Sequence, residues 1–316
     1  MGIFSSIEQL GREFSRPVNL ALGMFDGVHI GHQQVLEAST FHARETNGCA
    51  VAFTFPAHPA SHLRPEHAPP LLMNPSQKAR MLHSYGMDHV ILHDFDDEFS
   101  DIPATEFPAF LKERIPSLLG LSVGKNFKFG KGRQGDSSFL EEVGNKMGML
   151  IKVVDSKKME GLAVSSSRIR EALGLGEIEK VNDMLGRDYR IYGEVFSGKK
   201  MGRKLGFPTM NLEWNPEAFP AYGVYAGTVK NLTTGDSLPA VANYGRRPTV
   251  EPDALTPKLE IHSLIDLNSE EWGYGSDIEM SLKHFIRPEK KFDSLDELKS
   301  QIDRDKQMSK ALVYPT

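Results

Sequence analysis

Residues 23–32 contain two histidines in a His-x-Gly-His spacing, preceded by closely spaced glycines. The loop follows an apolar run at residues 18–22, which predicts a buried strand, and precedes residues 33–38, which predict a helix. A helix N-terminus presents unpaired backbone N–H groups and a partial positive charge, so it suits phosphate. Here His29 and His32 can hydrogen-bond one polyphosphate, and the glycines let a nucleotide approach the backbone. The loop therefore predicts the kind of site that a nucleotidyl transferase needs.

Two further segments of the N-terminal half can contribute to such a site. His58 follows the apolar run at residues 49–55, where it can contact a ligand or be a loop histidine without a function. Residues 123–136 place Phe127 and Phe129 at alternate positions among glycines and cations. This loop can hold an aromatic ring system together with a phosphate, or it is a solvated turn over two core phenylalanines.

Residues 165–168 have the sequence Ser-Ser-Ser-Arg and stand at a predicted helix start. Three hydroxyls followed by arginines make a second helix terminus that can bind phosphate. The same serines also suit an ordinary helix N-cap. Both interpretations are open from this segment alone.

The C-terminal half has its own candidate chemistry. A glycine-bearing loop at residues 193–208 carries four cations and can wrap a polyphosphate, although its spacing is not that of a P-loop. Thr209 and Asn211 are two residues apart, so their oxygens lie on one face of an extended chain and can ligate Mg²⁺ or form a polar sheet face. Glu260 alternates with apolar neighbours and can act as a general base toward a hydroxyl or be an exposed strand residue.

The elements that must position the first set of residues alternate between strand and helix over the N-terminal half. Such alternation predicts a doubly wound parallel sheet with helices on both faces, a Rossmann-like α/β fold. Ligands in such folds bind beyond the C-terminal ends of the strands, where the His-x-Gly-His loop lies. The predicted strands are 18–24, 49–55, 88–94, 119–124 and 149–155, and the predicted helices are 32–46, 75–85, 104–115, 137–147 and 166–173.

After Arg187 the pattern changes to short strand-like runs separated by Gly, Pro and Asn turns, which predicts an antiparallel barrel or sandwich. A final helix is expected to open after Phe292, with Asp293 or Ser294 as its N-cap. The predicted strands are 189–196, 222–230, 238–244, 258–267 and 277–286. The expected division is a domain over 1–173, a connecting helix over 174–186 and a second domain over 187–316.

Composition sets the class of protein. A chain of 316 residues with 40% hydrophobic and 25% charged residues suits two soluble globular domains. The net charge of −5 gives no case for a nucleic-acid partner, and no apolar run reaches the roughly 20 residues that span a membrane. The single cysteine, Cys49, lies in an apolar run, so a buried thiol and a cytoplasmic location are expected.

Taken in order, the N-terminal segments resemble the adenylyltransferase module of bacterial riboflavin kinase/FAD synthetases, which carries Gly-x-Phe-Asp-Gly-Val-His-x-Gly-His, then Val-Gly-x-Asp/Asn-Phe-x-Phe-Gly, then Ser-Ser-Ser/Thr-Arg-Ile-Arg. The resemblance implies that His29 and His32 are catalytic and stabilise charge on ATP. The ATP-binding residues that it implies are Gly23, Phe25, Asp26, Gly27, His29, His32, Ser165, Ser166, Ser167 and Arg168. The flavin-binding residues that it implies are His58, Asn126, Phe127 and Phe129.

The C-terminal segments are similar to the riboflavin kinase module of the same family, through Gly-Arg-x-Leu-Gly-Phe-Pro-Thr-x-Asn-Leu and Glu260-Ile261-His262. The resemblance implies a six-stranded antiparallel barrel in which Glu260 is the catalytic base and Thr209 and Asn211 hold Mg²⁺. The implied ATP-binding residues are Gly198, Gly202, Arg203, Lys204, Pro208, Thr209 and Asn211. The chain departs from the family at Pro56-Ala57, Lys128 and Met210, where Glu-Pro, Arg and Ala are usual.

The resemblance implies a bifunctional enzyme that phosphorylates riboflavin with ATP to FMN and then transfers an adenylyl group from a second ATP to FMN. The products of the second reaction would be FAD and pyrophosphate, and Mg²⁺ would accompany ATP. Two alternatives remain at this point. One is a riboflavin kinase with an idle N-terminal domain, for which the altered Pro56-Ala57 segment is the motive. The other is a flavin-binding carrier without turnover.

Overall fold

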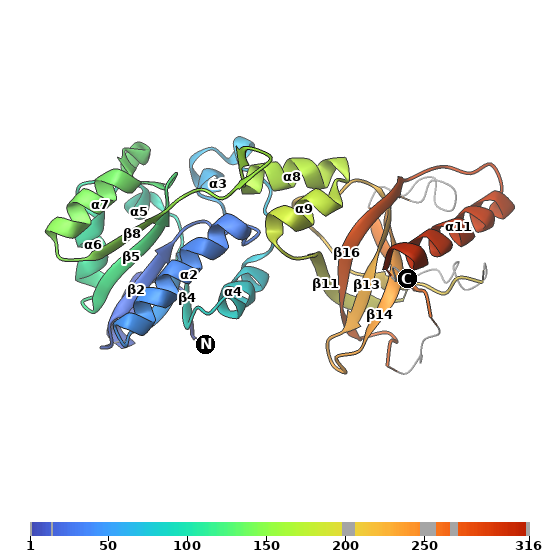
Figure 1. Cartoon of the computed structure of the whole chain (residues 1–316), viewed down its shortest axis with the longest axis horizontal. Coiled ribbons are helices and arrows are strands. Elements are labelled where there is room, and N and C mark those ends of the chain that lie inside the picture. The colour runs from blue at the N-terminus through green and yellow to red at the C-terminus, as the bar shows by residue number, and fades with distance from the viewer. Residues whose placement is uncertain (1, 14, 198–205, 247–256, 266–270, 314–316) are drawn as a thin grey trace. The chain divides into compact units, whose positions relative to one another are not determined.

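The computed structural model describes residues 2–13, 15–197, 206–246, 257–265 and 271–313 (Figure 1). The chain divides into two compact units, Met1–Ser166 and Ser167–Thr316, each with its own core. Cys49 is buried, as its apolar surroundings predict.

The first unit is built on a parallel sheet with the strand order β1-β4-β3-β2-β5-β8. Every neighbouring pair in this sheet is parallel, which confirms the predicted α/β class. The inner strands are nearly continuous apolar runs because both faces of the sheet are covered. The strands are β1 (Gly2–Phe4), β2 (Val18–Leu22), β3 (Cys49–Thr54), β4 (His89–Leu92), β5 (Leu118–Gly124) and β8 (Leu150–Val154).

Helices follow most strands, and their ends are set by local side chains. Asn74 caps α4 through a capping box with Gln77, and Pro75 occupies the first turn of that helix. Asp136, an ordinary N-cap residue, caps α7. The helices are α1 (Ile7–Glu13), α2 (Ile30–Glu45), α3 (Pro59–Leu63), η1 (Pro65–His67), α4 (Pro75–Ser84), α5 (Asp97–Ser100), α6 (Phe107–Arg114), η2 (Lys131–Arg133) and α7 (Ser137–Lys146). Two small hairpins pair β6 (Lys128–Phe129) with β7 (Gly135–Asp136) and β9 (Lys158–Met159) with β10 (Leu162–Ala163).

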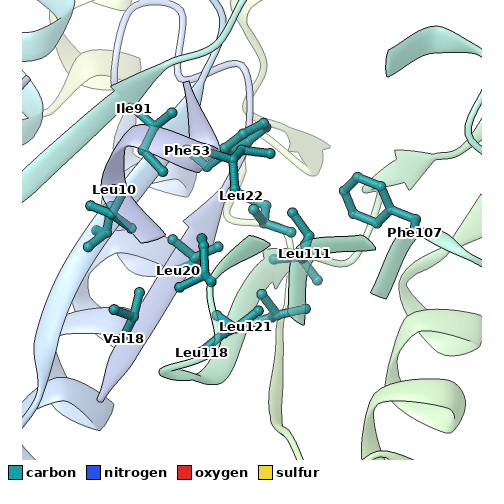
Figure 2. Close-up of a cluster of buried hydrophobic side chains, with 14 of the residues drawn as sticks. Leu10, Val18, Leu20, Leu22, Phe53, Ile91, Phe107, Leu111, Leu118 and Leu121 are labelled. Carbon is teal, nitrogen blue, oxygen red and sulfur yellow. The ribbon is translucent and has the colours of Figure 1, made fainter. Parts of the chain in front are cut away.

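The core of the first unit lies in two layers on opposite faces of the sheet. Alternate residues of β2 face the two layers: Leu20 points to one cluster and Ala21 to the other. Figure 2 shows the first cluster, where β2, β3, β4 and β5 meet α1 and α6 through Leu10, Phe107 and Leu111. The second cluster packs α2 and α4 against the other face.

The second unit is a closed antiparallel barrel with the strand order β11-β12-β15-β14-β13-β16 (Figure 1). The six strands confirm the barrel fold, and closure leaves no unpaired edge. The strands are β11 (Tyr189–Phe196), β12 (Met210–Leu212), β13 (Gly223–Asn231), β14 (Ser237–Gly245), β15 (Lys258–Ser263) and β16 (Asp277–Pro288).

Three helices flank this barrel. Helix α9 (Ile178–Leu185) packs against β11 and β16 and ends at Gly186 in the left-handed conformation. Helix α8 (Ser166–Leu175) precedes it. The final helix, α11 (Leu295–Val313), is capped by Ser294, whose hydroxyl accepts from the backbone N–H of Glu297 at 3.2 Å. The expected terminal helix and one of its two expected caps are therefore confirmed.

Candidate functional sites

The loop between β2 and α2 has a tightly constrained backbone. Phe25, Gly27 and Val28 all have positive φ angles, of 48°, 80° and 40°. Glycine adopts this region freely, but a phenylalanine and a β-branched valine there carry strain. Both non-glycine side chains are fully buried, so packing holds the loop in its strained conformation.

His29 and His32 come together at the start of α2. His29 is the N-cap of the helix, and its Nδ1 accepts from the backbone N–H of His32 at 3.2 Å. The two imidazole rings stack with centroids 3.6 Å apart and 15° between their planes. A side chain at Gly31 would place its Cβ 3.2 Å from the His29 ring, so glycine leaves room for the stack. The predicted pair is thus one surface at a helix N-terminus.

The environment of His32 keeps its imidazole neutral. Burial lowers the pKa of His32 well below its ordinary value, and the positive charges of His29 and Lys78 lower it further. Its Nδ1 is buried and has no hydrogen-bond partner among the described residues. Phe25 packs edge-on against the same ring, at 5.4 Å between centroids. In the tautomer that carries its proton on Nδ1, the neutral His32 ring has a hydrogen bond left to donate.

Asp26 is a buried residue of the loop, and its hydrogen bonds connect the loop to other parts of the chain. Its carboxylate accepts from the backbone N–H of Leu72 at 2.9 Å. Its carbonyl accepts from the hydroxyl of Ser166 at 2.8 Å. The structure therefore joins the His-x-Gly-His loop to the serine segment, although the two are far apart in sequence.

The rest of the serine segment lies at the start of α8. Ser166 is the first residue of that helix, Ser165 precedes it, and Ser167 and Arg168 stand in its first turn. Ser165 and Arg168 are half-buried and both make polar contacts.

The residues expected on the flavin side differ in exposure. Asn126 is exposed, and its amide donates to the hydroxyl of Ser156 at 3.2 Å. Phe127 is half-buried and stacks on Phe129 at 5.7 Å between centroids. Phe129 belongs to the hydrophobic core. His58 is the N-cap of α3, with its Nδ1 accepting from the backbone N–H of Ala60 at 3.1 Å.

The lysines of the same loop are engaged by carboxylates. Lys125 pairs with Asp155 at 2.9 Å, and the other two pairs are Lys128 with Asp136 at 3.4 Å and Lys131 with Asp101 at 3.0 Å. All three pairs are exposed, so solvent screens them and each contributes little to stability. A bound phosphate would have to compete with these carboxylates for the lysines.

In the second unit, the barrel brings Glu260 beside Thr209 and Asn211. Thr209 Oγ1 donates to Glu260 Oε1 at 3.4 Å. The strand register pairs Glu260 directly with Asn211 of β12 on one side and Asn243 of β14 on the other. Burial along β15 alternates as expected, with Leu259 buried and Glu260 half-buried. The predicted pair and the predicted base therefore share one surface, and Asn243 joins them.

Helix α11 adds positive charge near this surface, which the sequence motifs did not indicate. Lys306 Nζ lies 5.0 Å from the centroid of the Phe207 ring. Pro208 carbonyl lies 2.7 Å from His262 Nδ1. Burial lowers the pKa of His262, with a smaller lowering from Lys306 and Lys310. The predicted ATP-binding residues Gly198, Gly202, Arg203 and Lys204 lie outside the described residues.

The described residues contain neither a cluster of metal ligands nor a membrane-spanning helix. No group of three or more His, Cys, Asp or Glu side chains there could hold a metal ion by itself. Within the same residues, no helix is both long enough and apolar enough to cross a membrane.

Comparison with known proteins identifies the family of each unit. The family model for FAD synthetase matches residues 12–168, and the model for riboflavin kinase matches residues 185–313. A protein of Haemophilus influenzae named bifunctional riboflavin kinase/FMN adenylyltransferase is 36% identical over 295 residues, covering 92% of this chain and 93% of its own. The protein of the same name from Escherichia coli K12 is 35% identical over 306 residues, covering 96% of each chain.

A solved structure is similar over the whole chain. The crystal structure described as a macrolide-efflux protein from Streptococcus pneumoniae has a TM-score of 0.85 and 27% identity, and the match covers 98% of both chains. A Bacillus subtilis relative named bifunctional riboflavin kinase/FMN adenylyltransferase is 34% identical and covers 91% of this chain. This chain therefore belongs to the family of bifunctional riboflavin kinase/FMN adenylyltransferases, with an FAD synthetase domain followed by a riboflavin kinase domain.

Proposed function

We propose that this chain phosphorylates riboflavin with ATP to give FMN and ADP, and then converts FMN and a second ATP to FAD and pyrophosphate. The observation that carries the proposal is the presence, in one chain, of two separate sites: the His29–His32 stack at a helix N-terminus and the Thr209–Asn211–Glu260 surface on the barrel. Each site has the groups that one of the two transfers requires.

For adenylylation, a phosphate oxygen of FMN attacks the α-phosphorus of ATP, and pyrophosphate leaves. No covalent enzyme intermediate is needed, so the protein contributes position and positive charge. His29, His32 and the N-terminus of α2 stabilise the charge that builds up on the phosphate oxygens. The Ser165–Arg168 segment holds the departing pyrophosphate, an assignment supported by the Ser166 bond to the carbonyl of Asp26 in the loop.

For the kinase reaction, Glu260 takes the proton of the ribityl 5′-hydroxyl as that oxygen attacks the γ-phosphorus of ATP, and ADP leaves. A half-buried carboxylate beside a hydroxyl and two amides is placed to accept one proton. Pro208 and the glycine-rich segment at residues 198–204, which lies outside the described residues, would hold the ATP phosphates.

Thr209 and Asn211 would hold Mg²⁺ at this site. Their hydroxyl and amide oxygens suit a hard cation, and the described residues have no acidic cage, which fits an ion bound jointly by the protein and by ATP phosphates. When bound, Mg²⁺ supplies charge neutralisation at the phosphates.

We assign the flavin of the adenylylation site to the side of the unit that carries His58, Asn126 and Phe127. The support is chemical: an exposed amide next to a half-buried aromatic ring offers hydrogen bonds and a stacking face. Phe129 contributes from beneath, as the buried ring on which Phe127 stacks. We also propose that the chain acts in the cytoplasm, in agreement with its unpaired Cys49.

A single incubation tests the function. The purified chain is mixed with riboflavin, ATP and Mg²⁺, and the flavins are separated by chromatography over time. FMN that rises first and then gives way to FAD is the expected result. FMN that accumulates without FAD, even at high ATP and with FMN supplied directly, contradicts the adenylylation half of the proposal.

A further inference from the structure

Lys78 of α4 is almost fully buried, with 1% of its surface exposed. Lysine is rarely buried to this extent unless its ammonium is bound by other groups. Here Nζ donates to the carbonyl of Phe55 at 2.6 Å and to the carbonyl of Met24 at 3.3 Å. No motif in the sequence indicates this role, because Lys78 lies in an ordinary polar helix.

The two carbonyls come from neighbouring strand ends. Met24 belongs to the His-x-Gly-His loop after β2, and Phe55 follows β3 directly. Thr54 Oγ1 donates to the same Met24 carbonyl at 2.8 Å. Through these hydrogen bonds, Lys78 connects the His-x-Gly-His loop to the end of β3. This is the edge of the sheet where the proposed phosphate site lies.

The charged surroundings of Lys78 also belong to that loop. The carboxylate of Asp26 favours the charged form of the Lys78 ammonium. The ammonium in turn disfavours protonation of His32, and so does the charge of His29. Burial lowers the pKa of Lys78 to about 8, while Asp26 raises it. The ammonium is mostly charged at neutral pH, and the protein interior screens that charge less than water does.

A buried cation costs free energy, and an apolar side chain of the same size can fill such a space at lower cost. Two carbonyl bonds alone do not require a full charge. A polyphosphate above the loop does benefit from one, since fixed positive charge stabilises the charge that develops during phosphoryl-group transfer.

We propose that Lys78 is a positioning residue of the adenylylation site: it fixes the Met24 turn, so that the His29–His32 stack and the N-terminus of α2 face the phosphates of ATP, and it adds fixed positive charge beneath them. This inference rests on the proposed function, because it assigns the bound polyphosphate to the same loop.

The test compares Lys78→Met with Lys112→Met in the full chain. Lys112 is a matched control: it is also a partly buried lysine that donates to a backbone carbonyl, that of Leu118, but at the N-terminal end of β5. Lys78→Met should lower the rate of FAD formation by about tenfold to a hundredfold, the range expected for losing hydrogen bonds from a charged donor. Lys112→Met should leave this rate within about twofold of the wild-type value. The rate of riboflavin phosphorylation should also stay within about twofold in both variants.

Lys78→Arg separates position from charge. Arginine keeps the charge, so it should recover part of the lost rate and should move any loss of activity above pH 8 to higher pH. If Lys78→Met and Lys112→Met lower FAD formation equally, Lys78 has only a structural role and the proposal is overturned.

A second measurement does not depend on turnover. The imidazole resonances of His29 and His32 are followed by NMR during titration with pH and with inorganic pyrophosphate. In Lys78→Met, the pKa of His32 should rise, because a neighbouring cation is gone, and pyrophosphate should bind about tenfold or more weakly. An unchanged His32 titration together with unchanged pyrophosphate affinity overturns the proposal.

The same NMR titration distinguishes a failure of the proposed function from a failure of the proposed role of Lys78. If the wild-type chain makes no FAD but pyrophosphate still shifts His29 and His32 in a Lys78-dependent way, the function fails while the role of Lys78 stands. If pyrophosphate does not shift these resonances in the wild-type chain, the phosphate site itself is refuted, and the role of Lys78 with it.

Discussion

Lys78 makes the stability of the first unit depend on pH in a direction that can be stated in advance. Burial lowers its pKa from 10.5 to about 8. Below pH 8 the folded unit holds a charge that it disfavours. Between pH 8 and 10.5 the unfolded chain binds a proton that the folded chain has lost, so the free energy of unfolding rises with pH. A pKa lower by about 2.5 corresponds to about 3 kcal/mol, of which about 2 kcal/mol falls between pH 7 and pH 9.5.

The sequence offers separate probes for the two units. Cys49 is the only cysteine, and it is buried in β3 of the first unit. Both tryptophans, Trp214 and Trp272, lie in the second. The labelling rate of Cys49 by a thiol reagent reports opening of the first sheet, and tryptophan fluorescence reports the barrel. Comparing wild type with Lys78→Met at each pH cancels the ionisation of the thiol itself.

Between pH 7 and pH 9.5, the opening free energy of the wild-type chain should rise by about 2 kcal/mol relative to that of Lys78→Met. Lys112→Met should remain parallel to wild type over this range, and tryptophan fluorescence should show no such difference in any variant. The opening free energy of the wild-type chain minus that of Lys78→Met should therefore increase with pH. A value of this difference that stays constant or falls between pH 7 and pH 9.5 would show that burial does not lower the pKa of Lys78.

Three further substitutions test the remaining sites. Glu260→Gln should reduce FMN formation by about a hundredfold or more while FAD formation from supplied FMN persists, as followed by flavin chromatography. His29→Ala should reduce FAD formation by about tenfold or more and spare FMN formation, and loss of the α2 cap should lower the opening free energy reported by Cys49 labelling by about 1 kcal/mol. Asp305→Asn removes the negative charge and one of the two oxygens that accept from Arg287 at 2.8 to 3.1 Å. It should destabilise the barrel by about 3 kcal/mol in denaturation followed by tryptophan fluorescence.

Each of these three predictions has an outcome that would contradict it. Unchanged FMN formation in Glu260→Gln would mean that another group takes the proton. Equal loss of both activities in His29→Ala would contradict the division of the two reactions between two units. A barrel of normal stability in Asp305→Asn would mean that the contact between β16 and α11 contributes little.

Most of the parallel sheet could be predicted because its strands are buried on both faces and so appear as continuous apolar runs, such as Cys49–Thr54. The edge strand β1 has three residues, too few to show any period, and the helices α1, α3 and α5 have only seven, five and four residues. Helix α2 begins two residues earlier than its apolar pattern because His29 caps it, and histidine is not a usual cap residue.

The site could be predicted where its residues lie close together in the sequence. The His-x-Gly-His spacing identifies His29 and His32 because one helix turn brings them together. Lys78 could not be found in this way, since its burial depends on how α4 packs beside the ends of two strands. For Phe129, the composition of its loop left both a ligand contact and a core position open, and only the packing of the unit shows that its ring lies in the core beneath Phe127.

The positive φ angles of Phe25 and Val28 bear on how this protein could be engineered for heat resistance. A left-handed backbone costs a residue with a side chain about 1 to 2 kcal/mol, and glycine avoids that cost. Glycine at either position would avoid that cost but would also remove a fully buried side chain, a loss of about 3 to 5 kcal/mol for a phenylalanine. A screen for thermostable variants would therefore keep both side chains. At these two residues, selection for heat resistance and selection for a preformed nucleotide loop favour the same side chains.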